Sequence, residues 1–431
     1  MTLKFLSVVE SRPGLIKVSA ISEAIQRFNR DPSGRKIHHV LIHTGQSSET
    51  ADVARYFNDL DLPKPDKYLG VPGAASPMQK SALIAESFAN VVLQERPAIV
   101  LVTGDADSAL DCALVTKRIR YLNGTGRALF PALAHVEAGF RNFDCRTSRE
   151  VNRVVIDLLS DYLFTTEETS NENLFREGIP ADRIHFVGSV IIDTLLRHRT
   201  LMWKSSILSD LQLISEASAR PFALLAMPQI RGVDQSKKLR EIEGVLLEMS
   251  RRMPVIFPAS QSIWQRVRNG ELAEYFIDHF FDGPEPWDSR VRVRIVPPLG
   301  YLDFVRLLAA AKVVLTDSAG VQEEAQVLGV PCITLAEHTS RPVTLVNGAN
   351  VVVGSDPRRI LKAFLRSTQD HHYVRSKGPT NWDGRAAERI IDTLWDHLTR
   401  AAKQGRSPEY RNNQKVRSLA GSRVASARES K

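Results

Sequence analysis

The fold is decided by the stretch KVVLTDSAGVQEEAQVLGVPCITLAEHTSRP, residues 312–342. Val313 to Thr316 is a short apolar run with a β-branched bias, which is typical of a strand buried on both faces. A turn of small residues follows, and helical spacing from Val321 to Leu328 ends at Gly329. Pro331 to Leu335 is the next apolar run. The stretch therefore predicts a strand, a turn, a helix and a second strand of a parallel sheet.

The turn of this unit, Asp317 to Gly320, is also suited to holding a ligand. A helix N-terminus presents free backbone N–H groups, and the helix dipole favours an anion there, so a phosphate group fits. Glu324, one turn into the helix, is near enough to accept hydrogen bonds from the hydroxyl groups of a sugar. The same pattern also fits an ordinary strand–turn–helix unit without a ligand. The rest of the sequence is needed to distinguish a binding site from a purely structural unit.

Apolar runs of strand length alternate with helical segments along both halves of the chain. The pattern begins at Phe5 to Val9 and restarts at Phe222 to Ala226, after a connector near Gly188 to Asp193. Such alternation predicts parallel, doubly wound sheets. The expected fold class is therefore α/β, with two Rossmann-like domains and a ligand cleft between them. The expected boundaries are 1–190 for the N-terminal domain, 191–385 for the C-terminal domain, 386–402 for a terminal helix and 403–431 for a basic, disordered tail.

Polar residues stand where several of these apolar runs end. Ligands of open α/β sheets bind beyond the carboxyl ends of the strands. Asp105 at such a position also fits a structural role as a helix N-cap. The candidates selected in this way are Arg12, Gln46, Asp105, Glu137 and Ser318.

The positive charge of the chain is concentrated at its C-terminal end. The 431 residues have a formal net charge of +8. Residues 401–431 hold eight Lys or Arg and two Glu, a net charge of +6, so the rest of the chain carries only +2. Because the expected folded part is close to neutral, we expect no nucleic-acid partner. A basic tail without apolar periodicity can still touch RNA or a membrane surface.

Other classes of protein are disfavoured by missing sequence signals. No run of 18 apolar residues predicts a membrane span, and the first residues lack the pattern of a signal peptide. Cys112, Cys145 and Cys332 are far apart and in no metal-binding spacing, which fits a reducing, cytoplasmic location. Neither half contains the G-x-G-x-x-G motif typical of NAD binding. We therefore expect no metal ion and no cofactor.

A series of short segments together resembles one enzyme family. They are TGQ (44–46), GD (104–105), HVEAGFR (135–141), E-x-NR (150–153), ENLFREGI (172–179), VG-x-x-x-ID (187–193), YLDF (301–304), TDSAGVQEEA (316–325), LG-x-P (328–331) and RP (341–342). In this order they resemble the UDP-N-acetylglucosamine 2-epimerases, over about residues 4–400. HVEAG followed by TDS-x-G-x-QEEA is the most specific part of the resemblance.

The resemblance implies a glycosyltransferase-B-type fold and a UDP-sugar substrate. Members of the family eliminate UDP from UDP-GlcNAc to give a glycal. Non-hydrolysing members add UDP back to yield UDP-ManNAc, and hydrolysing members add water instead. We therefore expect a UDP-GlcNAc 2-epimerase-like enzyme, with a UDP-binding second domain and a homodimeric assembly.

The resemblance also implies roles for individual residues of the second half. Ser318 and Gly320 would hold the diphosphate through backbone N–H groups, and Glu324 would hold the ribose hydroxyls. Phe304 would lie near the uracil, and Arg341 would neutralise phosphate.

In the first half, Arg12 and Lys17 match basic residues of the family's first loop, although Gly-Thr-Arg-Pro-Glu is replaced here by ESRPG (10–14). Gln46 is a further expected substrate-binding residue. Asp105 and Glu137 match two catalytic carboxylates, and Glu150 is a third candidate. Carboxylates tuned by their neighbours can serve as the base that removes the C2 proton and as the acid that helps UDP to leave.

The chain departs from the family at one catalytic position. The family's histidine motif after the first strand of the second domain is replaced by AMPQIRGVD (226–234), which places Pro228 at the histidine position. Proline has no titratable group, so its side chain cannot transfer a proton. His338, in a later loop, is a candidate substitute. Two alternatives to an epimerase therefore stay open: a hydrolase or transferase relative, and a catalytically silent UDP-sugar-binding protein.

Overall fold

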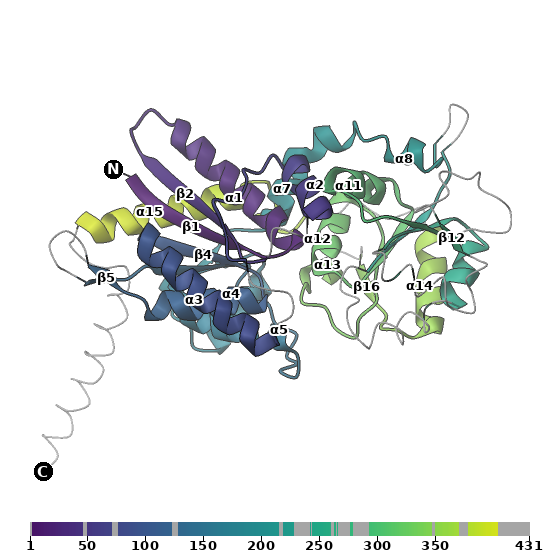
Figure 1. The fold of residues 1–431 in the computed structure, drawn as a ribbon. Coiled ribbons are helices and arrows are strands. Elements are labelled where there is room, and N and C mark those ends of the chain that lie inside the picture. The colour runs from purple at the N-terminus through teal and green to yellow at the C-terminus, as the bar shows by residue number, and fades with distance from the viewer. Residues whose placement is uncertain are drawn as a thin grey trace, which may run out of the picture. The chain divides into compact units, whose positions relative to one another are not determined.

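The computed structural model describes residues 2–45, 50–70, 76–122, 128–214, 219–227, 242, 244–259, 263, 265, 276–278, 293–346, 350–369 and 378–403. The chain divides into two compact units, each with its own sheet (Figure 1). Unit 1 comprises Met1–Glu49, Pro63–Gly188 and Arg385–Lys431. Unit 2 comprises Thr50–Leu62 and Ser189–Gly384. Gln46, Pro228 and the tail from residue 404 lie outside the described residues.

Unit 1 is built on a seven-stranded sheet in which all neighbouring strands are parallel. Its central strands are apolar and buried along their whole length, because helices cover both faces of such a sheet. In spatial order the strands are β3 (Lys67–Tyr68), β2 (Lys36–His43), β1 (Thr2–Val9), β4 (Ile99–Thr103), β7 (Ala132–Val136), β8 (Tyr162–Thr165) and β9 (Ile184–Phe186).

The helices of unit 1 follow the strands in sequence. They are α1 (Arg12–Arg30), α3 (Pro77–Glu95), α4 (Asp107–Arg118), α5 (Ser148–Leu159) and α6 (Glu168–Arg176), with a 3-10 turn at Ala181–Arg183 and a small hairpin of β5 (Tyr121–Leu122) and β6 (Ala128–Leu129). The last helix, α15 (Ala386–Lys403), returns to unit 1 and packs on α1. The rings of Phe28 and Trp395 lie 5.0 Å apart in this contact. The described part of the terminal helix is therefore a component of unit 1.

Unit 2 repeats the architecture with a second parallel seven-stranded sheet. Its strands, in spatial order, are β12 (Phe276–Asp278), β13 (Val293–Val296), β11 (Val255–Pro258), β10 (Ala223–Ala226), β14 (Val313–Thr316), β15 (Cys332–Thr334) and β16 (Asn350–Val352). Its named helices are α2 (Thr50–Asp59), α7 (Val190–Met202), α8 (Ile207–Asp210), α11 (Tyr301–Ala310), α12 (Ala319–Leu328), α13 (Val343–Val346) and α14 (Pro357–Gln369). Two such units confirm the predicted α/β class.

The strand, turn, helix and strand predicted from residues 312–342 are present as β14, α12 and β15. β14 and β15 are parallel, with Val314 opposite Cys332. α12 ends at Gly329, whose φ of 72° is the left-handed conformation that glycine adopts without strain. The N–H of Gly329 caps the last turn by donating to the carbonyl oxygens of Ala325 and Gln326.

Two local expectations differ from the structure. The expected connector near Gly188 to Asp193 is largely helical, because α7 already begins at Val190. The segment Thr50–Leu62, which was expected in the first domain, belongs to unit 2 and carries α2. Asp59 at the end of α2 accepts a hydrogen bond from the N–H of Leu302 on α11, at 3.3 Å. A contact over 243 positions of sequence has no local signal.

Candidate active site

Three strands of unit 1 end next to charged residues. β1 leads into α1, which begins at Arg12, β4 leads to Asp105, and β7 leads to Glu137. Glu137 has a φ of 71°, in the left-handed region that a residue with a side chain seldom adopts. Such strain is retained where the surrounding structure holds a functional group in place.

Lys17 and Glu137 form a nearly buried ion pair. Lys17 Nζ lies 2.5 Å from Glu137 Oε2, and the two side chains are 11% and 3% exposed. Gly104, with a φ of 74°, lies directly beside the Lys17 ammonium group. A Cβ atom at position 104 would lie 2.9 Å from Lys17 Nζ, closer than a carbon and a nitrogen normally approach. Glycine at this position therefore makes room for the lysine.

Asp105 and Glu150 are joined by one guanidinium group. Arg153 contacts Asp105 Oδ2 at 2.5 Å and Glu150 Oε2 at 2.9 Å. The other oxygen of Glu150 accepts the backbone N–H groups of Asn142 and Phe143, at 3.0 and 2.9 Å. Both oxygens of the buried Glu150 are thus occupied, which favours a structural task for this carboxylate.

The surroundings of Asp105 favour its ionised form. Burial acts to raise the pKa of Asp105, but the positive charges of Arg153, Arg149 and Lys17 outweigh burial and lower the pKa below its ordinary value. Asp105 is consequently a carboxylate near neutral pH, a form that can accept a proton.

From the sequence no role is expected for Arg153, although its spacing from Glu150 indicates that the two side chains interact. Glu150 and Arg153 are three residues apart on α5, a spacing that places two side chains on one face of a helix. Asn152 was also missed. Its Nδ2 donates to the backbone oxygen of Asp105 at 3.0 Å and to Asp107 Oδ1 at 2.7 Å. α5 therefore fixes Asp105 through both its side chain and its backbone.

A fully buried histidine ties the turns after β4 and β7 together. His135 Nε2 donates to the carbonyl oxygen of Gly104 over 2.9 Å, and Nδ1 lies 2.6 Å from Asp157 Oδ1. Asp157 Oδ2 accepts from the N–H of Gly139 at 3.0 Å and from Arg141 at 2.8 Å. Burial acts to raise the pKa of Asp157, but His135 and Arg141 lower it overall. Asp157 is thus the common acceptor that holds both turns.

In unit 2, the turn before α12 has the expected geometry of a helix N-terminus. Ser318 is the N-cap residue, and its N–H donates to Thr316 Oγ1 at 3.0 Å. Gly320 lies in the first turn, and a Cβ atom there would meet Ile191 Cδ1 at 3.4 Å, an ordinary contact. Packing does not require glycine at this position, where it lowers helix stability. Close approach of a ligand would explain it.

The two adjacent glutamates of α12 have different partners. Glu323 is fully buried, forms an ion pair with Arg341 Nε, and accepts a hydrogen bond from Ser189 at 2.5 Å. Arg341 was expected at a phosphate, and the structure places its guanidinium against Glu323. Glu324 instead accepts a hydrogen bond from the hydroxyl of Tyr301 at 3.0 Å.

The pKa of Glu324 is raised to about 8. Burial is the largest cause, and the neighbouring Glu323 raises the pKa further, whereas the hydrogen bond from Tyr301 lowers it. Phe304 lies one turn after Tyr301 on α11, half-buried against the apolar core of unit 2. The contact of Tyr301 with Glu324 thus joins α11, which carries Phe304, to α12.

The two remaining candidates lie at the start of a helix and in a loop. Arg12 is half-buried at the start of α1, and His338 is exposed in the loop after β15. Among the described residues, no group of His, Cys, Asp and Glu could hold a metal ion, and no helix is long and apolar enough to cross a membrane.

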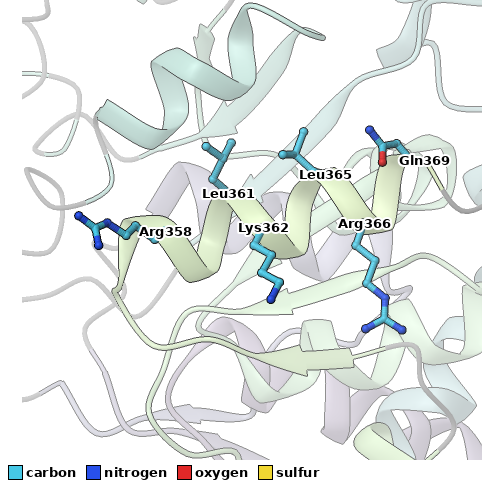
Figure 2. A pocket seen from close by; sticks show the side chains of 6 residues that line it. All are labelled: Arg358, Leu361, Lys362, Leu365, Arg366 and Gln369. Carbon is cyan, nitrogen blue, oxygen red and sulfur yellow. The ribbon is translucent and has the colours of Figure 1, made fainter.

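A hollow of about 490 Å³ lies along α14 of unit 2 and contains none of the candidate residues (Figure 2). Three of its six lining side chains are cationic. The lining residues are Arg358, Leu361, Lys362, Leu365, Arg366 and Gln369.

The two doubly wound units define a two-domain α/β protein of the glycosyltransferase-B type. The family model for UDP-N-acetylglucosamine 2-epimerase matches residues 30–395. The chain therefore belongs to the UDP-N-acetylglucosamine 2-epimerase family, and it is an epimerase, which is a kind of isomerase.

Two relatives illustrate the range of the family. UDP-N-acetylglucosamine 2-epimerase of Methanocaldococcus jannaschii is 33% identical over 91% of this chain and 99% of its own length. UDP-2,3-diacetamido-2,3-dideoxy-D-glucuronate 2-epimerase of Pseudomonas aeruginosa is 29% identical over 91% of this chain and 99% of its own length. The crystal structure of the M. jannaschii enzyme in complex with UDP-GlcNAc and UDP matches with a TM-score of 0.75 and 30% identity, and the match covers 91% of this chain and 100% of that one.

Proposed function

We propose that this epimerase interconverts UDP-GlcNAc and UDP-ManNAc. The observation that carries the proposal is the pair of carboxylates at the ends of β4 and β7, Asp105 and Glu137, each with its own cationic partner. A reaction that removes a proton from a carbon and later returns one to its opposite face needs two such groups. The M. jannaschii relative, with UDP-GlcNAc and UDP bound in its crystal structure, supports the choice of substrate.

The proposed reaction has two halves. In the first, a base takes the proton from C2 of the sugar, a double bond forms between C1 and C2, and UDP leaves from C1. In the second, UDP adds back to C1, and an acid delivers a proton to the other face of C2. UDP is both the leaving group and the incoming nucleophile, so the overall change is the configuration at C2.

We assign the proton transfers to Asp105 and Glu137. Asp105 accepts the C2 proton, because its lowered pKa keeps it ionised. Glu137 is the second proton-transfer group, held by Lys17. Glu150 acts by positioning Arg153, since its own oxygens are occupied. The Pro228 side chain transfers no proton, so the carboxylates transfer the protons without the family's histidine. We therefore expect slow turnover.

Unit 2 binds the UDP part in this proposal. The start of α12 at Ser318 and Gly320 holds the diphosphate, with the backbone N–H of Gly320 as a donor, in keeping with the glycine that packing does not require. The N–H of Ser318 is already bonded to Thr316 Oγ1, so Ser318 offers its hydroxyl to the diphosphate instead. Glu324 forms hydrogen bonds with the ribose hydroxyls, and Phe304 lies against the uracil. Arg341 adds positive charge near the phosphates while its Nε stays paired with Glu323. Arg12 and Gln46 are the proposed substrate contacts from unit 1.

The direct test is incubation of the purified protein with UDP-GlcNAc, followed by proton NMR of the anomeric region. We expect a mixture of UDP-GlcNAc and UDP-ManNAc with little free UDP. Accumulation of free UDP would identify a hydrolysing enzyme. Turnover of UDP-2,3-diacetamido-2,3-dideoxyglucuronate alone would move the substrate assignment to the modified sugar.

We also propose that the protein is a cytoplasmic homodimer. All three cysteines are free thiols, which fits a reducing compartment. Large apolar side chains on α3 are exposed, with Met78 at 76%, Leu93 at 45% and Leu83 at 37%, and a second copy would cover them. Sedimentation of the protein and of the Met78→Glu variant tests the assembly, since a dimer through this face should dissociate more readily in the variant.

A further inference from the structure

We propose that Tyr301 is a specificity-determining residue of the nucleotide site, which acts through Glu324 to select nucleotides with free ribose hydroxyls. The inference rests on the proposed function, in which Glu324 contacts the ribose. It adds a residue that touches no ligand itself and determines where the contacting carboxylate stands.

The contact between these two side chains is buried and specific. Tyr301 is 1% exposed and Glu324 is 3% exposed, and the tyrosine hydroxyl donates to Oε1 of the glutamate over 3.0 Å. No hydrogen bond among the described residues engages Glu324 Oε2. One oxygen is therefore anchored, and the other is left to pair with a ligand hydroxyl, which can accept from a neutral carboxyl group or donate to an ionised one.

The neighbouring Glu323 has partners of its own, and among the described residues Tyr301 is the hydrogen-bond partner of the Glu324 carboxyl group. The carboxylate of Glu323 is bound by Arg341 and Ser189. A glutamate side chain has three torsions, and fixing them costs conformational entropy of about 1.5–2 kcal/mol when a ligand has to do so. The hydrogen bond from Tyr301 fixes Glu324 before the nucleotide arrives.

Tyr301 is itself held at the start of α11. Asp59 on α2 accepts the N–H of Leu302 at 3.3 Å, and a Cβ atom at Gly300 would clash with Asp59 Oδ2, so glycine permits this close approach. The Tyr301 ring lies 6.4 Å from the ring of Tyr56 and 6.1 Å from that of His198, the latter edge-on at 89°. α2 and α7 thus fix the ring that anchors Glu324.

A prepositioned carboxyl group discriminates strongly between ligands that can and cannot form a hydrogen bond with its remaining oxygen. The 2′ and 3′ hydroxyls of the UDP ribose can each donate or accept such a hydrogen bond. A nucleotide without them leaves the buried oxygen of Glu324 dehydrated and unpaired, which is penalised more than the loss of an exposed hydrogen bond. Without the Tyr301 hydroxyl, Glu324 can turn away, and the penalty for the wrong ligand becomes smaller.

The test measures the dissociation constants of UDP and 2′,3′-dideoxy-UDP by isothermal titration calorimetry. The proteins are the parent, Tyr301→Phe, Glu324→Ala and the double variant. Tyr121→Phe is the matched control, because it also removes a hydroxyl that donates to a protein oxygen, the carbonyl of Pro97, but in unit 1. A thermal melt of each variant verifies folding.

We expect the parent and the control to prefer UDP over the dideoxy nucleotide by about 10- to 100-fold. Tyr301→Phe should lower this preference several-fold, mainly by weakening the binding of UDP. In the double variant the preference should equal that of Glu324→Ala, since Tyr301 acts through Glu324.

Four results would overturn the inference, and the last of them does not depend on Tyr301→Phe. The first is an unchanged preference in Tyr301→Phe, and the second is an equal loss of affinity for both nucleotides. The third is a further loss of preference when Tyr301→Phe is added to Glu324→Ala. These results differ from a failure of the proposed function, which would appear as a parent protein that does not bind UDP. If Tyr301→Phe does not fold, the parent and Glu324→Ala still decide whether the carboxylate discriminates, and a parent without preference refutes the inference.

Discussion

Replacing Arg153 by Met removes the cation shared by Asp105 and Glu150. Glu150 is 1% exposed and would keep two backbone donors but lose its charge partner, while Asp105, whose side chain is 22% exposed, would lose its nearest cation. Removal of one partner from a buried pair costs about 3–5 kcal/mol. Because the Arg153 side chain is 14% exposed and water can reach the remaining charges, we expect the lower end of this range, about 3 kcal/mol.

The stability loss is measured by urea denaturation followed by circular dichroism, with Arg146→Met as the matched control. Arg146 likewise makes two bonds to carboxylate oxygens, both of Asp144, but its side chain is 90% exposed, so its removal should leave the free energy of unfolding unchanged within error. The pKa of Asp105 should also rise in Arg153→Met, so the acid limb of the activity profile should move to higher pH. Equal stability of the two variants, or an unmoved acid limb, would refute the assignment of Arg153.

Two further substitutions test the contact of Gly104 with Lys17 and the raised pKa of Glu324. Gly104→Ala and Gly34→Ala impose the same left-handed strain, with φ near 74° in both, but only the first places a Cβ atom against Lys17, because a Cβ atom at position 34 would have no neighbour within 4 Å. Gly104→Ala alone should lower kcat, by about 100-fold, and similar losses in both would contradict the contact. Glu324 has an ordinary pKa of 4.5 and a folded pKa of about 8, so the folded protein holds an extra proton between these values and its stability falls as pH rises through them. The melting temperature of Glu324→Gln relative to the parent should therefore increase from about pH 5 to about pH 8.5, and a constant difference would argue against a buried neutral glutamate.

Local sequence patterns predict the sheet of unit 2 well and its helix α2 poorly. The apolar run of β14 and the glycine after α12 are signals contained in a few neighbouring residues, and the structure has both where the sequence indicates them. The place of α2 depends on its contact with α11, far along the chain, and on the glycine at position 300 that permits the approach of Asp59. Such a partnership is decided by tertiary packing, which single-segment patterns do not carry.

In the candidate site too, the sequence indicates some residues and only the fold shows the others. Asp105 and Glu137 follow apolar runs, so the sequence indicates them as strand-end residues. The partners that determine their chemistry come from other elements, Arg153 from α5 and Lys17 from α1. The i, i+3 spacing of Glu150 and Arg153 indicates that they share a helix face, but only the fold shows that this face meets Asp105.

The central claim is that carboxylates of unit 1 exchange the C2 proton of a UDP-sugar. It is tested most directly by incubating the protein with UDP-GlcNAc in D2O and following deuterium at C2 by NMR. Deuterium should enter C2, slowly because Pro228 stands at the family's histidine position, and Asp105→Asn and Glu137→Gln should each lower the rate by about 100- to 10,000-fold. No exchange in the parent, or exchange that both variants leave unchanged, would contradict it.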